Sequence, residues 1–179
     1  MVSSRTTDQR QELVEEIGIV EARRAMREGR PGDAAWYLGH PWTVQAVVEH
    51  GDARGRTIGF PTANMHLDDN DPLAFGIYAV RVKVLEAGVV TLLRDGVANF
   101  GVRPMFRTDK PLLEVHLFDF SGDLYGRELT VEFVAWMRPE VRFDGLEALV
   151  TQIQADAAAA RAILKPSLSL NTNVETQDS

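Results

Sequence analysis

The chain has 179 residues, of which 45% are hydrophobic and 25% are charged, so its size suits one compact domain with a short accessory segment. A formal net charge of -7 argues against a general binder of nucleic acid or anionic membranes, because both partners favour a basic surface. The absence of cysteine excludes disulfides, thiolate zinc sites and cysteine nucleophiles, and no apolar run is long enough to span a membrane. We therefore expect a cytoplasmic protein.

Apolar residues at helical spacing predict an amphipathic helix over residues 8–28. The apolar positions of this helix are Leu13, Ile17, Val20 and Met26. Asp33 is suited to cap a second, short helix that ends at Leu38, before the helix-breaking Gly39-His40-Pro41. Residues 1–38 are therefore expected to form a helical linker segment ahead of the main domain.

From Trp42 the hydrophobic period changes to two, which predicts that a strand begins the main domain. Further strand-like runs cover residues 76–85, 89–93, 96–100, 112–120 and 128–136. Turn-like triplets separate them at residues 86–88, 94–96 and 121–123. Strands joined by such short connections cannot form parallel crossovers, so we expect an antiparallel sheet. Closure into a small barrel would remove its exposed edges.

The C-terminal part of the chain predicts one more helix. Asp144 to Glu147 has a capping-box pattern, and apolar residues then repeat at helical spacing until Pro166. The main domain is thus expected to span residues 39–165. Residues 166–179 are polar and unpatterned, and we expect a disordered tail.

The segment RGRTIGFPTAN, residues 54–64, contains more backbone-permissive and polar residues than a hairpin turn requires. Gly55 and Gly59 would let backbone N–H groups approach an oxyanion, although the segment lacks the Walker P-loop pattern. Thr62 and Asn64 are two residues apart, so in an extended segment their neutral oxygens share a face. Mg²⁺ accepts such ligands when nucleotide phosphates supply the negative charge. The alternative is a solvated loop in which both side chains cap backbone groups.

In the strand LLEVHLFDF, residues 112–120, alternation separates Glu114 and His116 from the apolar face. Glutamate is disfavoured in strands, so Glu114 is a candidate general base, with His116 as the second candidate. Both side chains could instead lie on a solvated sheet face. Two further clusters, in residues 99–106 and 138–143, combine arginine with polar groups and could receive phosphate or form ordinary turns.

Taken together, these segments resemble the riboflavin kinase family, and in particular the kinase module of bacterial bifunctional riboflavin kinase/FAD synthetases. The resemblance runs from about Gly39 to Leu164. It rests on RGRTIGFPTAN, PLAFGIYAVRV, GVANFGVRP, LEVHLFDFSGDLYGRELTVEF, MRPEVRF and QIQADAAAAR, in the family's order. The family fold is mainly β, a six-stranded antiparallel Greek-key barrel followed by an α-helix, which agrees with the strand count above.

The resemblance implies transfer of the γ-phosphate of ATP to riboflavin, giving FMN and ADP, with Mg²⁺ as the metal. Glu114 matches the family's catalytic base, Thr62 and Asn64 match its metal and phosphate ligands, and Arg138 matches a flavin or phosphate contact. The ATP and phosphate site is accordingly expected to comprise Arg54, Gly55, Gly59, Thr62, Asn64 and Asn99. The expected partners are riboflavin/FMN and ATP/ADP, and the chain would act as a monomer or as a module of a larger bifunctional enzyme.

Two departures from the family pattern affect this hypothesis. Met105 stands where many members have threonine, which puts phosphate or metal geometry in doubt at that position. Residues 1–38 are too short for the nucleotidyltransferase module of the bifunctional members, so we expect FMN as the final product. One alternative is a catalytically inactive flavin- or nucleotide-binding barrel. Another is an OB-like barrel for single-stranded nucleic acid, which the acidic composition and the lack of a basic, aromatic strand face disfavour.

Overall fold

The computed structural model describes residues 3–51, 54–68, 70–102 and 110–165. Its helices are α1 (Ser3–Arg27), α2 (Pro31–Leu38), α3 (Arg54–Thr57) and α4 (Leu146–Leu164). Its strands are β1 (Trp42–Val47), β2 (Ala63–His66), β3 (Gly76–Glu86), β4 (Val89–Val102), β5 (Pro111–Leu117) and β6 (Glu128–Arg138).

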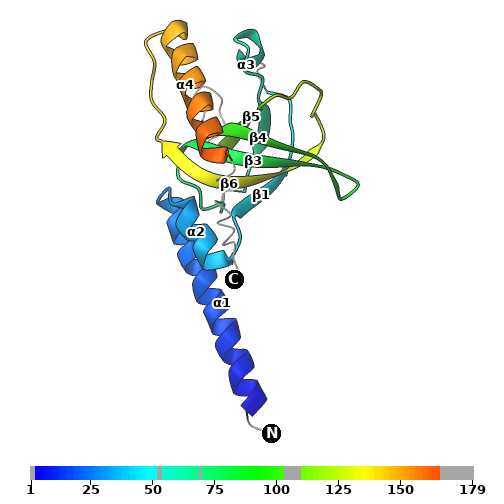
Figure 1. Cartoon of the computed structure of the whole chain (residues 1–179), viewed down its shortest axis with the longest axis vertical. Coiled ribbons are helices and arrows are strands. Elements are labelled where there is room, and N and C mark those ends of the chain that lie inside the picture. Colours follow the sequence, from blue (N-terminus) through cyan, green and yellow to red (C-terminus); the bar gives the residue numbers. More distant parts are fainter. Residues whose placement is uncertain (1–2, 52–53, 69, 103–109, 166–179) are drawn as a thin grey trace, which may run out of the picture.

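The strands form one antiparallel sheet in the order β1-β6-β3-β4-β5-β2. The sheet curls so that its two edge strands approach each other, and a single bridge between Glu49 and Asn64 joins the ends (Figure 1). This curled six-stranded barrel, with helices before and after it, confirms the expected fold class.

The expected number of strands is confirmed, but the chain is divided into strands differently. Residues 89–93 and 96–100 belong to the continuous strand β4, so the triplet at 94–96 is not a turn. Gly96 permits close approach of β5 instead, because a Cβ there would lie 2.7 Å from the carbonyl oxygen of His116. The sixth strand is β2, formed by the end of the Gly-rich segment. By contrast, Ala87 and Gly88 both have positive φ and make the tight β3–β4 hairpin expected there.

The main core fills the inside of the curled sheet. Alternate residues of the strands point inward, and the largest fully buried ones are Tyr78, Phe100, Phe133, Met65 and Leu113. Ala22, Ala25 and Met26 of α1 and Ala34 of α2 belong to the same buried cluster. The second half of α1 and α2 therefore pack onto one end of the barrel. The division of the chain at residue 38 remains a prediction.

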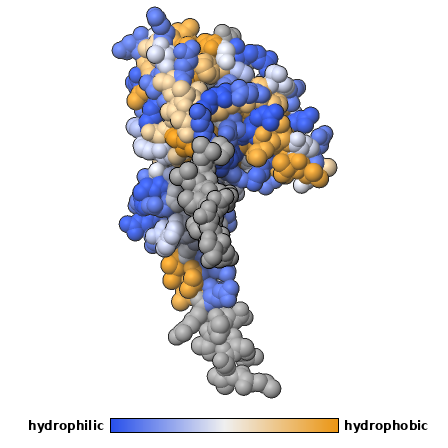
Figure 2. Space-filling model, in the orientation of Figure 1, coloured by the Kyte–Doolittle hydropathy of each residue, from blue (hydrophilic) through white to orange (hydrophobic). Residues whose placement is uncertain are grey.

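The first half of α1 projects beyond the barrel (Figure 1). Of the four apolar positions expected on one helix face, only Met26 is buried, whereas Leu13, Ile17 and Val20 are more than half exposed. Figure 2 shows apolar side chains gathered on the part of α1 beyond α2. Exposed apolar residues also lie on the β3–β4 hairpin, at Val89 and Leu93.

Helix α4 covers part of the outer face of the sheet. Ala160 and Leu164 form a second buried cluster there with Phe118 and its neighbours. Arg161 donates two hydrogen bonds to Asp119, of 2.7 and 2.9 Å, and this pairing holds the pKa of the Asp119 carboxyl below its usual value. The Arg161 guanidinium also lies 4.1 Å from the ring centre of Phe118.

The side-chain caps expected at the starts of α2 and α4 do not form. α2 begins at Pro31, and Asp33 forms an ion pair with Arg30 instead of capping it. α4 begins after Gly145 without a side-chain hydrogen bond at its N-cap, so the capping box expected at Asp144 does not form. A proline in the first turn of α2 needs no backbone partner for its nitrogen, which explains how that helix starts without a cap.

Candidate active site

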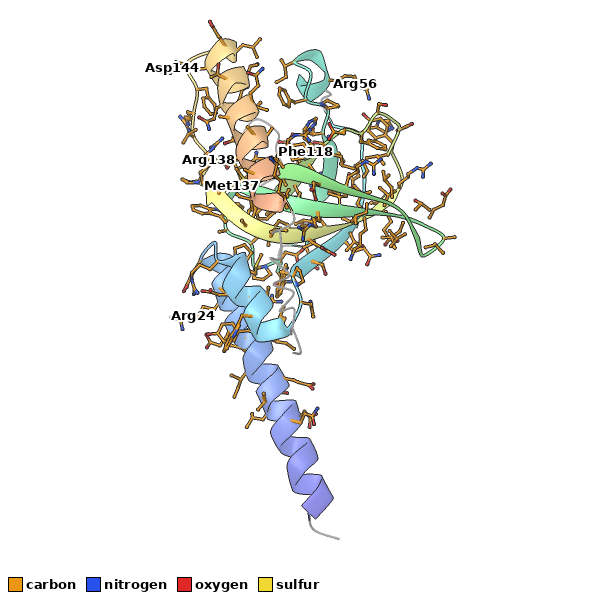
Figure 3. The ribbon with its side chains drawn as sticks, in the orientation of Figure 1. Arg24, Arg56, Phe118, Met137, Arg138 and Asp144 are labelled. Carbon is orange, nitrogen blue, oxygen red and sulfur yellow. The ribbon has the colours of Figure 1, made fainter. Side chains whose placement is uncertain are left out.

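A cavity of about 340 Å³ lies between the outer face of the sheet, α4 and the segment that leads from α3 into β2. This volume is within the range of about 300–1,000 Å³ that is typical of small-molecule sites. Figure 3 labels Arg138 beside α4 and Arg56 on α3, on either side of this region. The cavity wall is mostly apolar, with a few polar groups, as small-molecule sites usually are.

Five residues of the cavity floor, four of them polar, form one row across the sheet. Strand register pairs Asn64 of β2 with Glu114 of β5, and Glu114 with Asn99 of β4. It then pairs Asn99 with Ile77 of β3, and Ile77 with Arg138 of β6. All five residues line the cavity. Because paired residues on one sheet face are direct neighbours, backbone hydrogen bonding alone brings these distant parts of the sequence together.

At one end of the row, Thr62 and Asn64 both line the cavity. Asn64 is 6% exposed, and its Nδ2 donates a 3.4 Å hydrogen bond to the carbonyl oxygen of Thr62. Its Oδ1 is buried and has no hydrogen-bond partner among the described residues. The backbone of Asn64 is fixed by Glu49, whose N–H donates to the Asn64 carbonyl at 2.8 Å. A buried, unpaired amide oxygen beside a threonine fits a hard cation, which prefers neutral or anionic oxygen ligands.

Two glycines make room for this end of the site. The backbone approaches the Asn64 amide so closely at Gly51 that a Cβ there would overlap it. A Cβ on Gly55 would overlap the carbonyl oxygen of Phe60, where the chain folds back and the Phe60 N–H donates to Gly55 at 2.8 Å. The segment thus contains a one-turn helix, α3, and a tight return that sequence reasoning did not predict.

Glu114 lies second in the row, between Asn64 and Asn99, on the face of β5 opposite the buried Leu113 and Val115. The expected alternation is confirmed, but the solvated face offered as the alternative is not, because Glu114 and His116 line the cavity and the adjacent Phe118 is covered by α4. A carboxylate lining a cavity between amide groups can accept a proton from a bound hydroxyl.

His116 has one ring nitrogen engaged. Its Nδ1 lies 2.8 Å from the carbonyl oxygen of Pro61. A carbonyl can only accept, so Nδ1 carries the proton, and the imidazole fastens the segment before β2 to β5. Phe60 and Phe118 pack edge-on against the ring.

Arg138 lies at the other end of the row and is held by α4. Its Nε and Nη2 donate to the two carboxylate oxygens of Asp156, at 2.9 and 2.5 Å, and its Nη1 donates to Pro139. Gln152 donates a further 2.9 Å bond to Asp156. The Asp156 side chain is 9% exposed and that of Arg138 is 21% exposed. Since a carboxylate already neutralises the guanidinium, Arg138 is better suited to a neutral acceptor than to a phosphate.

A second cavity, of about 330 Å³, adjoins the first. Thr62 lines both cavities. The second is bounded by Val48 and Pro61 on one side and by residues of the β5–β6 connection on the other, including Phe120, Asp123 and Tyr125. Two adjoining cavities that meet at Thr62 offer room for two ligands.

Several residues expected at the site lie elsewhere or outside the described part of the chain. Gly59 is exposed, with positive φ, and lines neither cavity. Arg54 begins α3, but its side chain lies outside the described residues. Met105 falls in residues 103–109, which also lie outside them, and so does the tail.

Sequence reasoning missed Asp156 and the apolar wall of the cavity. That wall comprises Val141, Phe143, Leu149 and Ile153. Asp156 stands at helical spacing from Ile153 and Ala160, on the buried side of α4, and a charged residue in such a position is the signal that could have identified it. Among the described residues, no group of three or more histidine, aspartate or glutamate side chains is placed to hold a metal ion.

Comparisons with known proteins identify the family of the chain. The family description "Riboflavin kinase" (flavokinase) matches residues 38–164. The bifunctional riboflavin kinase/FMN adenylyltransferase of Pseudomonas fluorescens is 47% identical over 152 residues, which cover 84% of this chain and 47% of that protein. The chain belongs to the riboflavin kinase family, whose members are ATP-dependent kinases that generally need a divalent metal.

Two solved structures resemble the fold. A crystal structure described as a macrolide-efflux protein from Streptococcus pneumoniae has a TM-score of 0.70 and 34% identity, covering 79% of this chain and 45% of that one. Riboflavin kinase from Trypanosoma brucei has a TM-score of 0.53 and 24% identity, covering 70% of this chain and 79% of that one, which supports the fold alone. The chain spans about half the length of the curated relatives it matches. None of the helices in the described ranges is long and apolar enough to cross a membrane.

Proposed function

We propose that this chain is a riboflavin kinase, which transfers the γ-phosphate of ATP to the 5′-hydroxyl of riboflavin and releases FMN and ADP. The observation that carries the proposal is the row Asn64, Glu114, Asn99, Ile77 and Arg138, which lines a single cavity. Membership of the family supports the same reaction.

In this reaction, Glu114 accepts the proton of the 5′-hydroxyl as its oxygen bonds to the γ-phosphorus. The bond between that phosphorus and the bridging oxygen of ADP breaks, and the electron pair leaves with ADP. A general base of this kind contributes about 10²–10⁴-fold to the rate. Phosphoryl transfer otherwise depends mainly on positioning and on neutralising charge.

The Thr62 hydroxyl and the unpaired Asn64 Oδ1 would hold the divalent metal, which we propose is Mg²⁺. When bound with the nucleotide, the metal neutralises phosphate charge. Gly55 lines the main cavity together with Thr62, so the phosphates would lie there, and the second cavity would take the remainder of ATP. Thr62 supports this division because it lines both cavities.

The flavin would occupy the main cavity, with its ring against Val141, Phe143 and Ile153. Arg138 would donate a remaining N–H to a neutral ring acceptor, because Asp156 already balances its charge. We further propose that residues 39–165 are the kinase domain and that residues 1–38 are a helical segment preceding it.

The test is to incubate the purified chain with riboflavin, ATP and Mg²⁺ and to separate the flavins by chromatography with fluorescence detection. We expect FMN to accumulate with an equal amount of ADP, and chelation of the metal to stop the reaction. Glu114→Gln is the matched control, since it keeps the shape of the side chain and removes the base. Riboflavin that binds but stays unchanged would favour the inactive binding module instead.

A further inference from the structure

Asn99 lies next to Glu114 in the floor of the cavity, on the side away from Asn64. Asn99 lies on β4, where it pairs with Glu114 of β5 on one side and with Ile77 of β3 on the other. The Oδ1 of Asn99 is buried and has no hydrogen-bond partner among the described residues. Glu114 is thus flanked by two buried amide oxygens, those of Asn64 and Asn99, and each needs a donor or a cation.

The chemistry of this oxygen limits its ligand. A phosphate at neutral pH offers oxygens that accept hydrogen bonds, so it cannot satisfy an amide oxygen. A hydroxyl can, because its O–H donates. A cation could also do so, but Thr62 and Asn64 lie on the opposite side of Glu114, whereas the next neighbour of Asn99 is the apolar Ile77. The surroundings of Asn99 therefore favour a hydroxyl.

The order of the residues in the row indicates which part of the substrate would carry the hydroxyl bound at Asn99. Thr62 and Asn64 mark the phosphate end, Glu114 marks the reacting hydroxyl, and Ile77 and Arg138 lie at the end with the apolar wall. Adjacent strands are about 4.8 Å apart, so a group bound at Asn99 lies one strand spacing from Glu114. In riboflavin, the atoms between the 5′-hydroxyl and the ring are those of the hydroxylated ribityl chain.

We propose that Asn99 Oδ1 accepts a hydrogen bond from a ribityl hydroxyl, and that this contact makes the site select flavins that carry a polyhydroxylated chain. The proposal rests on the proposed function, and it assigns Asn99 to the acceptor substrate instead of the ATP and phosphate site expected from the sequence. Asn99 is then a specificity-determining residue that recognises the ribityl chain of the flavin, while Arg138 and the apolar wall contact the flavin ring.

The experiment compares the binding of riboflavin with that of lumiflavin, which has the same ring system without the ribityl chain. Flavin fluorescence is titrated with wild-type protein and with Asn99→Ala. We expect Asn99→Ala to weaken riboflavin binding about tenfold, as for a lost hydrogen bond that leaves a polar group unpaired, and to leave lumiflavin binding unchanged. In turnover, the KM for riboflavin should rise and the KM for ATP should stay the same.

Two further variants make the result specific. Asn99→Asp keeps an acceptor oxygen in the same position and should retain the preference for riboflavin over lumiflavin. Asn64→Ala, which removes the matching amide on the other side of Glu114, should keep that preference and change the dependence on metal and ATP. If Asn99→Ala fails to fold, its loss of lumiflavin binding would reveal this. Asn99→Asp then tests the proposal by itself, because loss of the preference for riboflavin over lumiflavin in that variant would contradict it.

Other outcomes contradict the proposal directly. Equal losses for both flavins in Asn99→Ala would make Asn99 a packing residue, and a raised KM for ATP alone would return it to the phosphate site. These results are distinct from failure of the proposed function, because the binding preference is measured without ATP. A wild-type chain that prefers riboflavin through Asn99 but makes no FMN would contradict the kinase reaction and leave the role of Asn99 intact.

Discussion

The floor and the outer wall of the cavity are built in different ways. On the floor, Asn64, Glu114 and Asn99 belong to neighbouring strands, and the backbone ladder of the sheet fixes their spacing. The wall consists of residues 139–145, which have no regular structure, and of α4. It is joined to the sheet near the site by the ion pair between Arg138 and Asp156.

This difference places the groups proposed for the reaction on the sheet and the surface proposed for the flavin ring on the wall. Groups that must be held accurately for proton transfer lie on the element whose geometry is most constrained. The surface proposed for the flavin ring belongs to an irregular connection and to α4, which side-chain contacts and not the backbone ladder hold against the sheet, so it can adjust while the floor stays fixed. Substitutions on the floor should therefore change turnover or ligand chemistry, whereas those at the wall should change stability and flavin affinity together.

The largest effect is expected on the floor, for Glu114→Gln. Loss of the base should lower kcat by about 10²–10⁴-fold, while binding of riboflavin and the melting temperature stay close to those of the wild type. Glu140→Gln is the matched control, because Glu140 lines the same cavity from the wall. If kcat fell equally in Glu114→Gln and Glu140→Gln, or fell as far when His116 alone was replaced, Glu114 would not be the general base.

The next effect is expected at the wall, for Asp156→Asn. The Arg138 guanidinium would lose its charged partner in a buried setting, so the free energy of unfolding should fall by about 2–3 kcal/mol in denaturant titrations. The KM for riboflavin should rise as well. Asp119→Asn is the control, because Asp119 pairs with Arg161 of the same helix at an exposed position, where an ion pair stabilises little. Similar losses of stability in both variants would contradict the distinction between the two pairs.

Thr62→Ala should have a smaller effect, restricted to the nucleotide end of the floor. Loss of the hydroxyl should raise the Mg²⁺ concentration needed for half-maximal activity and raise the KM for ATP, each by about tenfold, with the KM for riboflavin unchanged. Thr62→Ser keeps the hydroxyl and should restore most of the wild-type metal dependence. An unaltered metal requirement in Thr62→Ala would exclude Thr62 from the proposed metal site.

The floor was easier to predict from sequence than the wall, and the reason is physical. Local alternation was enough to assign Glu114 to the polar face of its strand and to place Thr62 and Asn64 on one side of the segment that leads into β2. The row itself was not predictable, since it depends on register between strands far apart in the chain. β2 escaped notice because its four residues follow a glycine-rich segment.

The wall depends on tertiary contacts that leave a weaker trace in the sequence. The apolar spacing predicts the helix α4, but it does not single out Asp156, whose partner Arg138 lies 18 residues away on β6. Arg138 itself was singled out through the family resemblance, and only the structure reveals that its charge is already balanced. A buried acid on an apolar helix face is thus the informative pattern, because it requires a partner from another element.

The smallest predicted effect tests how accurately the floor must be held. Gly51 contacts neither proposed substrate, yet a Cβ there would overlap the Asn64 amide, so Gly51→Ala should displace that side chain from its hydrogen bond with the Thr62 carbonyl. We expect the KM for ATP to rise by about threefold to tenfold at limiting Mg²⁺, because a small misplacement of a ligand weakens binding without removing it. Gly88→Ala is the control for a glycine substitution away from the site, since Gly88 has open space around it in the β3–β4 hairpin, where its positive φ should cost stability but leave the KM for ATP unchanged. If Gly51→Ala left the metal and ATP dependence untouched while Asn64→Ala changed both, the backbone around Gly51 would have to yield, and the nucleotide end of the floor would be as adjustable as the wall.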